Sequence, residues 1–405
     1  MLDIIRVFLV FGLMLVLLRR KVPVGYVMLL SSGAILLLYR TPPDSILQLL
    51  SKAAFSPSTV KLLLALSLIR VFELMLREHQ MLTTMMEAVK QHVRSRRAVI
   101  ISMPMLIGML PSLGGAYFSA PMVKQASEGL GLRPEEKAFV NYWYRHPWEY
   151  VLPLYPGILL ASAITGIHLT QLMAANAAAA IAVFLSGFAF SMRGLKKKES
   201  HHAPEEPVRS ASSRKNLAGF LPIALLLVMV MVFRIELHYA LAAIIVPLFV
   251  IFRYPLKNSL RLLRHGFTRE VILLILGIMV FKEAFEGSGA VAKISSFFLE
   301  QQLPVLPAIC LLPFAAGLLT GHTVGFVGST FPLVLSIGGS SLEVVVLAFG
   351  VGFLGVLLSP VHLCLVLTRE YFKADTGGMY RRIVPASLCV LCAVFLEYAV
   401  LSALR

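Results

Sequence analysis

Two stretches of this chain place small residues, hydroxyl side chains and prolines at the same spacing. They cover residues 112–121 and 323–332, and a shift of 211 residues lays the first on the second. The positions that then share a residue type are Ser112 and Thr323, Gly114 and Gly325, Ser119 and Thr330, and Pro121 and Pro332. Glycine and proline at this density interrupt helices. An interrupted helix exposes N–H groups that attract anions and C=O groups that attract Na⁺, so both stretches predict a binding site.

The candidate substrate- and ion-binding residues are the small and hydroxyl-bearing residues of these stretches, with one neighbouring histidine. They are Ser112, Gly114, Gly115, Ser119, Thr320, His322, Thr323, Gly325, Ser329 and Thr330. Small residues also let membrane helices pack closely, so a packing role is the alternative. Two such stretches in register favour a shared binding site over packing alone.

A second group of candidates consists of polar residues inside otherwise apolar segments, where ionisable side chains are costly and usually functional. Arg145, His146 and Glu149 are expected on adjoining turns of one helix, and Asn176 and His362 lie in two other apolar segments. In this position a histidine or glutamate would relay protons, and Arg145 would balance an anionic solute. The spacing of Arg145 and Glu149 equally permits a structural ion pair. For Asn176, a hydrogen bond between helices is the favoured interpretation.

Two further sets of charges occupy predicted membrane spans at helical spacing. They are Arg70 with Glu73, and Lys282 with Glu283 and Glu286. Opposite charges three or four residues apart meet on one helix face, which predicts pairs that neutralise each other inside the membrane.

No spacing in the sequence indicates a metal or cofactor site. Cys389 and Cys392 form one CxxC within an apolar run and have no second pair, so we expect buried thiols. The chain contains neither an HExxH motif nor an ATP-binding P-loop, and we assign no catalytic residue.

The elements that must position these residues are membrane helices. The chain has 405 residues, of which 58% are hydrophobic and 14% charged, whereas soluble domains are about 45–50% apolar and about 25% charged. This composition excludes soluble enzymes, collagen-like chains and disordered proteins. With about 20 residues needed per span, we expect ten membrane spans. They are 4–18, 24–39, 59–76, 141–160, 165–192, 217–233, 239–252, 270–287, 343–367 and 385–402.

Positive charge orients these spans, because cytoplasmic loops of membrane proteins are enriched in Lys and Arg. Loops 77–97 and 193–215 carry five and seven such residues, and loops 253–269 and 368–384 carry five and four. Three apolar stretches separate the members of each pair, so one stretch in each set must enter and leave on the same side. The net charge of +16 comes largely from these clusters and does not indicate nucleic acid.

The stretches that fail to cross are expected to be re-entrant hairpins at 98–123, entered from the cytoplasm, and 306–335, entered from outside. The fold is then an all-α polytopic membrane protein with two inverted repeats, about ten transmembrane helices and two re-entrant helical hairpins. Residues 1–192 form the first repeat and residues 216–405 the second, joined by a polar cytoplasmic linker at 193–215.

Three stretches resemble one known family: Met103–Pro111 with the two glycines that follow, Tyr144–Tyr155, and Ser359–Leu365. Together they resemble the membrane family called domain of unknown function 401 over nearly the whole chain. The resemblance implies membership of the ion transporter superfamily, which includes citrate, dicarboxylate, gluconate and arsenite carriers, and two hairpin tips that hold substrate and coupling ion. The tips lack the Ser-Asn-Thr of sodium–dicarboxylate carriers, so the resemblance indicates the mechanism class rather than the substrate.

We therefore predict a secondary active transporter that moves a small, carboxylate-like organic anion across the cytoplasmic (inner) membrane of a prokaryote by alternating access. H⁺ or Na⁺ would drive this symport, with no other cofactor. The expected partners are the solute and the lipid bilayer, with a homodimer allowed and no nucleic acid. A passive channel is the main alternative, because channels also use broken helices. An intramembrane enzyme is disfavoured, because Asp3, Asp44 and Asp375 lie outside the spans or at their edges.

Overall fold

Every regular element is a helix in the residues that the computed structural model describes, which are 2–93, 95–111, 115–191 and 213–404. The predicted all-α class is confirmed for these residues. Apolar runs become helices in lipid because a helix satisfies its own backbone hydrogen bonds. The candidate residues Ser112 and Gly114 and most of the linker 193–215 lie outside the described residues.

The first part of the chain pairs long apolar helices with shorter ones that connect them. Its helices are α1 (Leu2–Arg19), α2 (Val24–Leu38), α3 (Pro43–Phe55), α4 (Pro57–Glu78), α5 (Met81–His92), α6 (Arg96–Gly108) and α7 (Gly115–Ala126). The stretch predicted as the first hairpin thus consists of two helices, α6 and α7, which pack against each other.

An interrupted segment follows, made of α8 (Pro134–Trp143), α9 (Trp148–Val151) and α10 (Pro156–Thr165), with α11 (Leu169–Ala175) and α12 (Ala177–Ser191) after it. The helix stops after Trp143 because Pro147, four residues later, has no N–H to donate to the Trp143 carbonyl and its ring crowds that carbonyl. Arg145 and His146 therefore lie in the turn between α8 and α9, and Glu149 lies on α9. The expectation that these three residues share one helix was wrong.

The second part of the chain shows a similar order of elements. Its helices are α13 (Ser213–Ala218), α14 (Leu221–Met231), α15 (Leu237–Ile251), α16 (Leu256–Gly266), α17 (Arg269–Gly287), α18 (Ala290–Glu300), α19 (Val305–Thr320), α20 (Thr323–Gly338), α21 (Leu342–Leu358), α22 (Leu363–Phe372) and α23 (Thr376–Ala403). Here the stretch predicted as the second hairpin is the helix pair α19 and α20, which also pack together. Their turn uses Gly321 at φ +68°, a left-handed conformation that favours glycine.

Three helical segments among the described residues are long and apolar enough to cross a membrane: Leu169–Ser191, Leu342–Phe372 and Thr376–Ala403. Shorter apolar helices accompany them, including α2, α15, α19 and α20. Large apolar side chains such as Phe8, Leu225 and Leu396 are exposed on the outer faces of the helices. Apolar surface of this extent is stable against lipid rather than water. The chain is therefore a multi-pass membrane protein.

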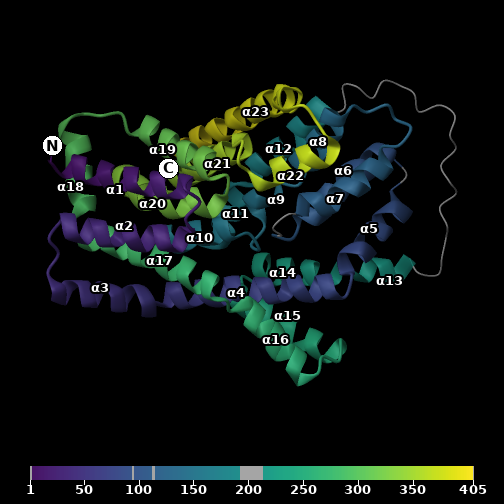
Figure 1. Ribbon diagram of the computed structural model, residues 1–405, viewed down its shortest axis with the longest axis horizontal. Coiled ribbons are helices and arrows are strands. Elements are labelled where there is room, and N and C mark those ends of the chain that lie inside the picture. The colour runs from purple at the N-terminus through teal and green to yellow at the C-terminus, as the bar shows by residue number, and fades with distance from the viewer. Residues whose placement is uncertain (1, 94, 112–114, 192–212, 405) are drawn as a thin grey trace.

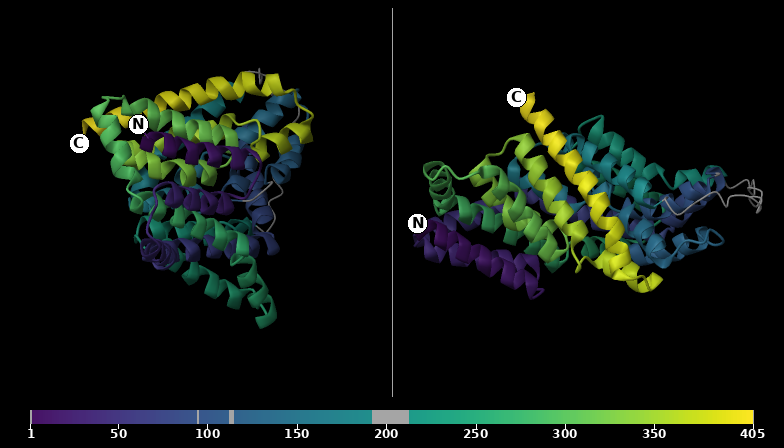
Figure 2. Two further views of the ribbon diagram at one scale, coloured as in Figure 1. Left: turned by 60° about the vertical axis from the view of Figure 1, so that its left-hand side comes forward. Right: turned by 90° about the horizontal axis from the view of Figure 1, so that it is seen from above.

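The helices are arranged so that the interrupted segments lie inside. Figure 1 shows α23 along one edge of the molecule, with α3 and α4 end to end along the opposite edge and α16 projecting beyond them. Seen from above in Figure 2, α23 crosses diagonally over its neighbours. It packs on α21 and α12. In the segment Leu342–Phe372, 83% of the most apolar stretch of 18 residues is buried inside the protein. In α23 the corresponding stretch is only 28% buried.

Two pairs of helices cross so closely that glycine is required at the contact. On α2 and α17, a Cβ added to Gly277 would lie 2.3 Å from the carbonyl oxygen of Gly25. On α19 and α21, a Cβ added to Gly317 would lie 2.2 Å from the carbonyl oxygen of Gly352. Small residues at such crossings let backbones approach and increase dispersion contacts between membrane helices.

Two expectations about particular side chains need correction. Cys389 and Cys392 are exposed rather than buried, on a face of α23 that also exposes Leu388 and Leu396. Glu73 pairs with Arg77 at 2.6 Å, while Arg70 donates to the Thr268 hydroxyl at 3.0 Å. Arg77, rather than Arg70, is therefore the direct ion-pair partner of Glu73. Lys282 does lie 3.5 Å from both Glu283 and Glu286, as expected from their spacing.

Candidate functional site

The candidate site is a cavity of about 600 Å³ where helices from both parts of the chain meet. One wall comes from α4 and the ends of α16 and α17. The opposite wall comes from three interruptions: the α8–α10 turns, the α19–α20 turn and the α21–α22 turn. A cavity of this size suits a small organic molecule, since such pockets commonly have volumes of about 300–1,000 Å³.

The structure brings five of the predicted site residues to the wall of this cavity. They are Arg145, Glu149, His322, Thr323 and His362. These residues come from three interruptions that the chain separates by up to some two hundred positions, so only the tertiary fold unites them. His146 lies directly behind His362 and is fully buried.

The first residues of three helices lie on the cavity wall that the interrupted segments form. Pro156 begins α10, Thr323 begins α20 and Leu363 begins α22, and all three residues line the cavity. The start of a helix carries unpaired N–H groups and about half a positive charge, which favours anions. At α20 the His322 side chain caps the helix by accepting a hydrogen bond from the Gly325 N–H at 3.0 Å.

Charged side chains add to the positive electrostatic potential that the helix starts create in the cavity. The lining includes Arg70, Arg77 and Arg145 against Glu73 and Glu149, a formal excess of one positive charge. The Glu73–Arg77 pair lies toward the more exposed end, where the Arg77 side chain is 45% exposed and the Glu73 side chain 16%. Of the other two arginines, Arg70 is half-buried and Arg145 is buried.

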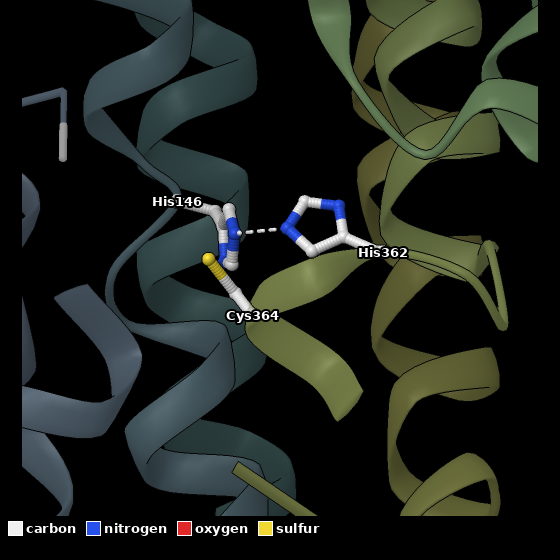
Figure 3. Close-up of side chains that lie close together, drawn as sticks. All are labelled: His146, His362 and Cys364. Atoms are coloured by element: carbon white, nitrogen blue, oxygen red, sulfur yellow. Dashed lines mark hydrogen bonds between the residues drawn. The ribbon is translucent and has the colours of Figure 1, made fainter. Parts of the chain in front are cut away.

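A buried cluster lies at the inner end of the cavity. The Nε2 atom of His146 lies 3.2 Å from the Nε2 atom of His362. The Cys364 thiol completes a group whose nitrogen and sulfur atoms all lie within 4.8 Å of one another. In Figure 3 the His146 ring faces His362 and Cys364, which come from the α21–α22 segment. Such a group could exchange a proton or bind a metal ion.

Hydrogen bonds to backbone carbonyls hold the interrupted segments against each other. The Tyr142 hydroxyl on α8 donates to the Leu357 carbonyl at the end of α21, at 2.9 Å. The Trp148 indole donates to the Met105 carbonyl on α6 at 2.8 Å. The Ser359 hydroxyl donates to the Leu318 carbonyl on α19 at 2.6 Å. Each bond satisfies a carbonyl close to a helix break or end, so the breaks are braced rather than loose.

Several predicted hydroxyls are used within their own helices. Thr320, Ser329 and Thr330 donate to carbonyls four residues earlier, at 2.7, 2.6 and 2.7 Å. None of the three lines the cavity. Gly325 does not line it either and contributes its N–H to the helix cap. A Cβ added to Gly325 would lie 2.8 Å from the His322 Nδ1 atom.

Ser119 belongs to a separate buried network. Its hydroxyl donates to the Asn141 amide oxygen at 2.7 Å. The Asn141 amide nitrogen donates in turn to the Ala116 carbonyl and to the Thr368 hydroxyl, at 2.9 and 3.0 Å. This network ties α7 to α8 and α22. Gly115 begins α7 and is also buried, outside the cavity lining.

Asn176 lies between α11 and α12. Its amide nitrogen donates to the Leu172 carbonyl within the same segment at 2.8 Å, while its buried amide oxygen has no partner among the described residues. The hydrogen bond that the structure contains is therefore local, not the predicted bond between helices. Asn176 does not line the cavity.

Comparison with known families identifies the chain. The family model described as "Protein of unknown function (DUF401)" matches residues 4–401. The chain belongs to this family. A comparison with curated proteins finds no match.

The fold of this DUF401 member is similar to that of the YdaH transporter of Alcanivorax borkumensis, whose crystal structure is described as having an unusual topology. The TM-score is 0.61 with 12% sequence identity, and the match covers 89% of each chain. At this identity the similarity establishes a shared fold.

Sequence reasoning missed six polar residues that line this cavity: Arg70, Glu73, Arg77, Tyr155, His265 and Cys364. Arg70 and Glu73 were predicted only as a self-neutralising pair, Arg77 and His265 only as parts of cytoplasmic loops, and Tyr155 and Cys364 only as parts of stretches that carry the family resemblance. The ionisable residues in an apolar span were a usable signal for Arg70 and Glu73. No local pattern indicates Cys364, because its neighbour His146 lies in a distant segment.

Proposed function

We propose that this protein is a secondary active transporter that moves a small organic anion across the cytoplasmic membrane of a prokaryote by alternating access. H⁺ or Na⁺ is the proposed coupling ion, and the solute is carboxylate-like. The protein is proposed to be a carrier and not an enzyme, so no residue is given a catalytic role.

One observation carries this proposal: the first residues of α10, α20 and α22 line one cavity together with Arg70 and Arg145. Helix N-termini and arginines each stabilise a carboxylate, and arginine can bind both its oxygens at once. Interrupted helices around a central cavity are the arrangement that secondary transporters use for substrate. The similarity to the YdaH transporter fold supports the same conclusion.

The topology proposed from the sequence fits this arrangement. In it, ten spans and two re-entrant hairpins form two inverted repeats, with α6–α7 as the first hairpin and α19–α20 as the second. Support comes from the element order, in which a helix pair precedes an interrupted segment in both parts of the chain. Under this orientation the exposed cavity end, near Arg77 and His265, faces the cytoplasm.

A passive channel is the second candidate. A channel needs a continuous path, whereas His146, directly behind the cavity-lining His362, and Phe353, whose ring contacts His146, are both fully buried. Burial behind the cavity favours a carrier that opens to one side at a time.

The decisive experiment is transport in liposomes containing the purified protein. Radiolabelled citrate, succinate and gluconate are offered with no gradient, with an imposed Na⁺ gradient and with an imposed pH gradient. We expect accumulation above the external concentration for at least one anion, and only with one of the gradients. Equilibration without accumulation would support a channel, and no transport of any organic anion would contradict the proposal. Light scattering of the detergent-solubilised protein tests whether it is a homodimer.

A further inference from the structure

We propose that His146, His362 and Cys364 form a binding site for a divalent transition-metal ion of the Zn²⁺ class at the inner end of the cavity. This site goes beyond the proposed transport of an organic anion and does not depend on it. The three side chains converge in Figure 3 from two segments that the fold holds together.

The spacing of the nitrogen atoms fits a metal ion. Two imidazole nitrogens bound tetrahedrally to Zn²⁺, each at about 2.0–2.1 Å, lie about 3.3 Å from each other. The Nε2 atoms of His146 and His362 lie 3.2 Å apart. Both nitrogens can therefore bind one ion without a change in their separation.

The His146 ring is oriented as in known metal sites. Its Nδ1 atom lies 2.6 Å from the Tyr142 carbonyl oxygen. A carbonyl only accepts, so Nδ1 carries the hydrogen and the Nε2 lone pair points toward His362. Metal-binding histidines usually donate their other N–H to a carbonyl or carboxylate in this way.

His362 supplies a second, independent observation. Without a metal, its Nε2 must donate the hydrogen in the contact with His146, because the His146 Nε2 is an acceptor. Its Nδ1 would then be a bare acceptor, and that buried atom has no hydrogen-bond partner among the described residues. A metal ion removes this constraint, because both Nε2 lone pairs then bind the ion and Nδ1 carries the hydrogen.

Cys364 is placed to act as a thiolate. It is the second residue of α22, and the start of a helix stabilises the negative thiolate that metals bind. A fourth ligand is close, since the Glu149 Oε1 atom lies 3.8 Å from the His146 Nε2 atom. Imidazole nitrogens with a thiolate select Zn²⁺ and related ions over Mg²⁺ and Ca²⁺, which prefer oxygen ligands. The cavity reaches His362 and Cys364, which gives the ion an entry path.

Metal binding by the purified full-length protein tests this inference. The protein is purified without a histidine tag, stripped of metal and titrated with Zn²⁺, with Mg²⁺ as the comparison. Co²⁺ is added in parallel, because a Co²⁺–thiolate bond gives a near-ultraviolet charge-transfer band. We expect one Zn²⁺ per chain, no comparable Mg²⁺ binding, and the Co²⁺ band.

Matched variants separate this site from the other thiols and histidines. Cys364→Ser and His362→Gln should weaken Zn²⁺ binding by at least about tenfold, and Cys364→Ser should abolish the Co²⁺ band. Cys389→Ser and His168→Gln, which change exposed residues, should leave both unchanged. Size-exclusion chromatography of the metal-free variants checks folding. Stoichiometric binding that survives both site variants, or no binding by the unaltered protein, would overturn the inference. Neither result bears on transport, which these titrations do not measure.

Discussion

The Nε2 atoms of His146 and His362 lie 3.2 Å apart although 216 residues separate the two histidines in the chain. Each histidine sits in the interruption of a helix, His146 between α8 and α9 and His362 between α21 and α22. The two interruptions therefore meet at the centre of the molecule. Their contact lies at the cavity wall, because His362 lines the cavity.

Gly325→Leu should reduce organic-anion uptake by about tenfold or more while the protein still inserts and folds. The new side chain would meet the His322 ring, because even a Cβ at Gly325 would lie 2.7 Å from its Cε1 atom. Displacing that ring removes the cap of α20, and a loss of about 1.4 kcal/mol in solute binding corresponds to a factor of ten. Uptake at a subsaturating solute concentration is the measurement.

Gly33→Leu is the control for this variant, because a Cβ at Gly33 has no neighbouring atom within 4 Å. It should transport normally. Equal uptake by the two variants would argue against a role for the start of α20 in binding.

Arg70→Gln should raise the KM for the anion by about ten- to a hundredfold with little change in maximal rate. A hydrogen bond to a charged group contributes about 1.5–3 kcal/mol, and its loss from a binding cavity appears mainly in KM. Arg264→Gln is the control, since Arg264 is exposed on α16 and does not line the cavity. If KM is the same in both variants, Arg70 does not contact the solute.

Asn141→Ala should destabilise the protein by about 2–4 kcal/mol. Asn141 is fully buried and makes three hydrogen bonds, which link Ser119, Ala116 and Thr368. Each bond contributes about 1 kcal/mol, and the partners left buried without one add to the loss. Thermal unfolding in detergent measures the effect, with Asn258→Ala on α16 as the comparison.

The same network predicts a milder phenotype for Ser119→Ala. This variant should lower thermal stability but leave the KM for solute unchanged, because Ser119 faces Asn141 and not the cavity. A rise in the KM for the solute with unchanged stability would instead indicate that Ser119 contributes to solute binding.

Glu283→Ala should lower stability by about 1–2 kcal/mol. The Glu283 carboxylate is 5% exposed and lies 2.6 Å from the Lys52 ammonium on α3. Removing a buried partner is costly, but the Lys52 side chain is 64% exposed and regains solvation, which limits the loss. The pair Lys61–Glu236 is the control, because its side chains are 49% and 45% exposed. Glu236→Ala should lower the unfolding temperature much less than Glu283→Ala. A similar drop for the two variants would contradict a stabilising role for the buried Glu283 carboxylate.

The helical fold and some of its breaks follow from local sequence. Pro147 and Gly321 mark breaks that the structure contains, whereas Pro104, Pro121, Pro313 and Pro332, which were also expected to break helices, lie inside α6, α7, α19 and α20. Short helices were harder to foresee. Residues 256–266 were expected to be a cytoplasmic loop and instead form α16, because its buried face with Leu262 and Gly266 packs on α4 while lysine and arginine stay exposed.

The candidate site was harder to predict than the fold. Thr323 and His362 line the cavity as expected, whereas the hydroxyls of Ser329 and Thr330 bond to their own helix. Sequence spacing cannot distinguish these outcomes, because each hydroxyl can reach either a ligand or the preceding turn. The contact between His146 and Cys364 depends on how two distant segments pack, which no local pattern encodes.

The glycine crossings limit which parts can slide. Gly277 of α17 presses on Gly25 of α2, and Gly317 of α19 presses on Gly352 of α21, with no room for a single added carbon at either place. Helices packed this closely resist sliding past each other, so each of the two helix pairs would move as one rigid body. If the solute crosses by a rocking motion, the moving parts must slide against each other at some other helix contact. Cross-links between α2 and α17, or between α19 and α21, should therefore leave the transport rate unchanged.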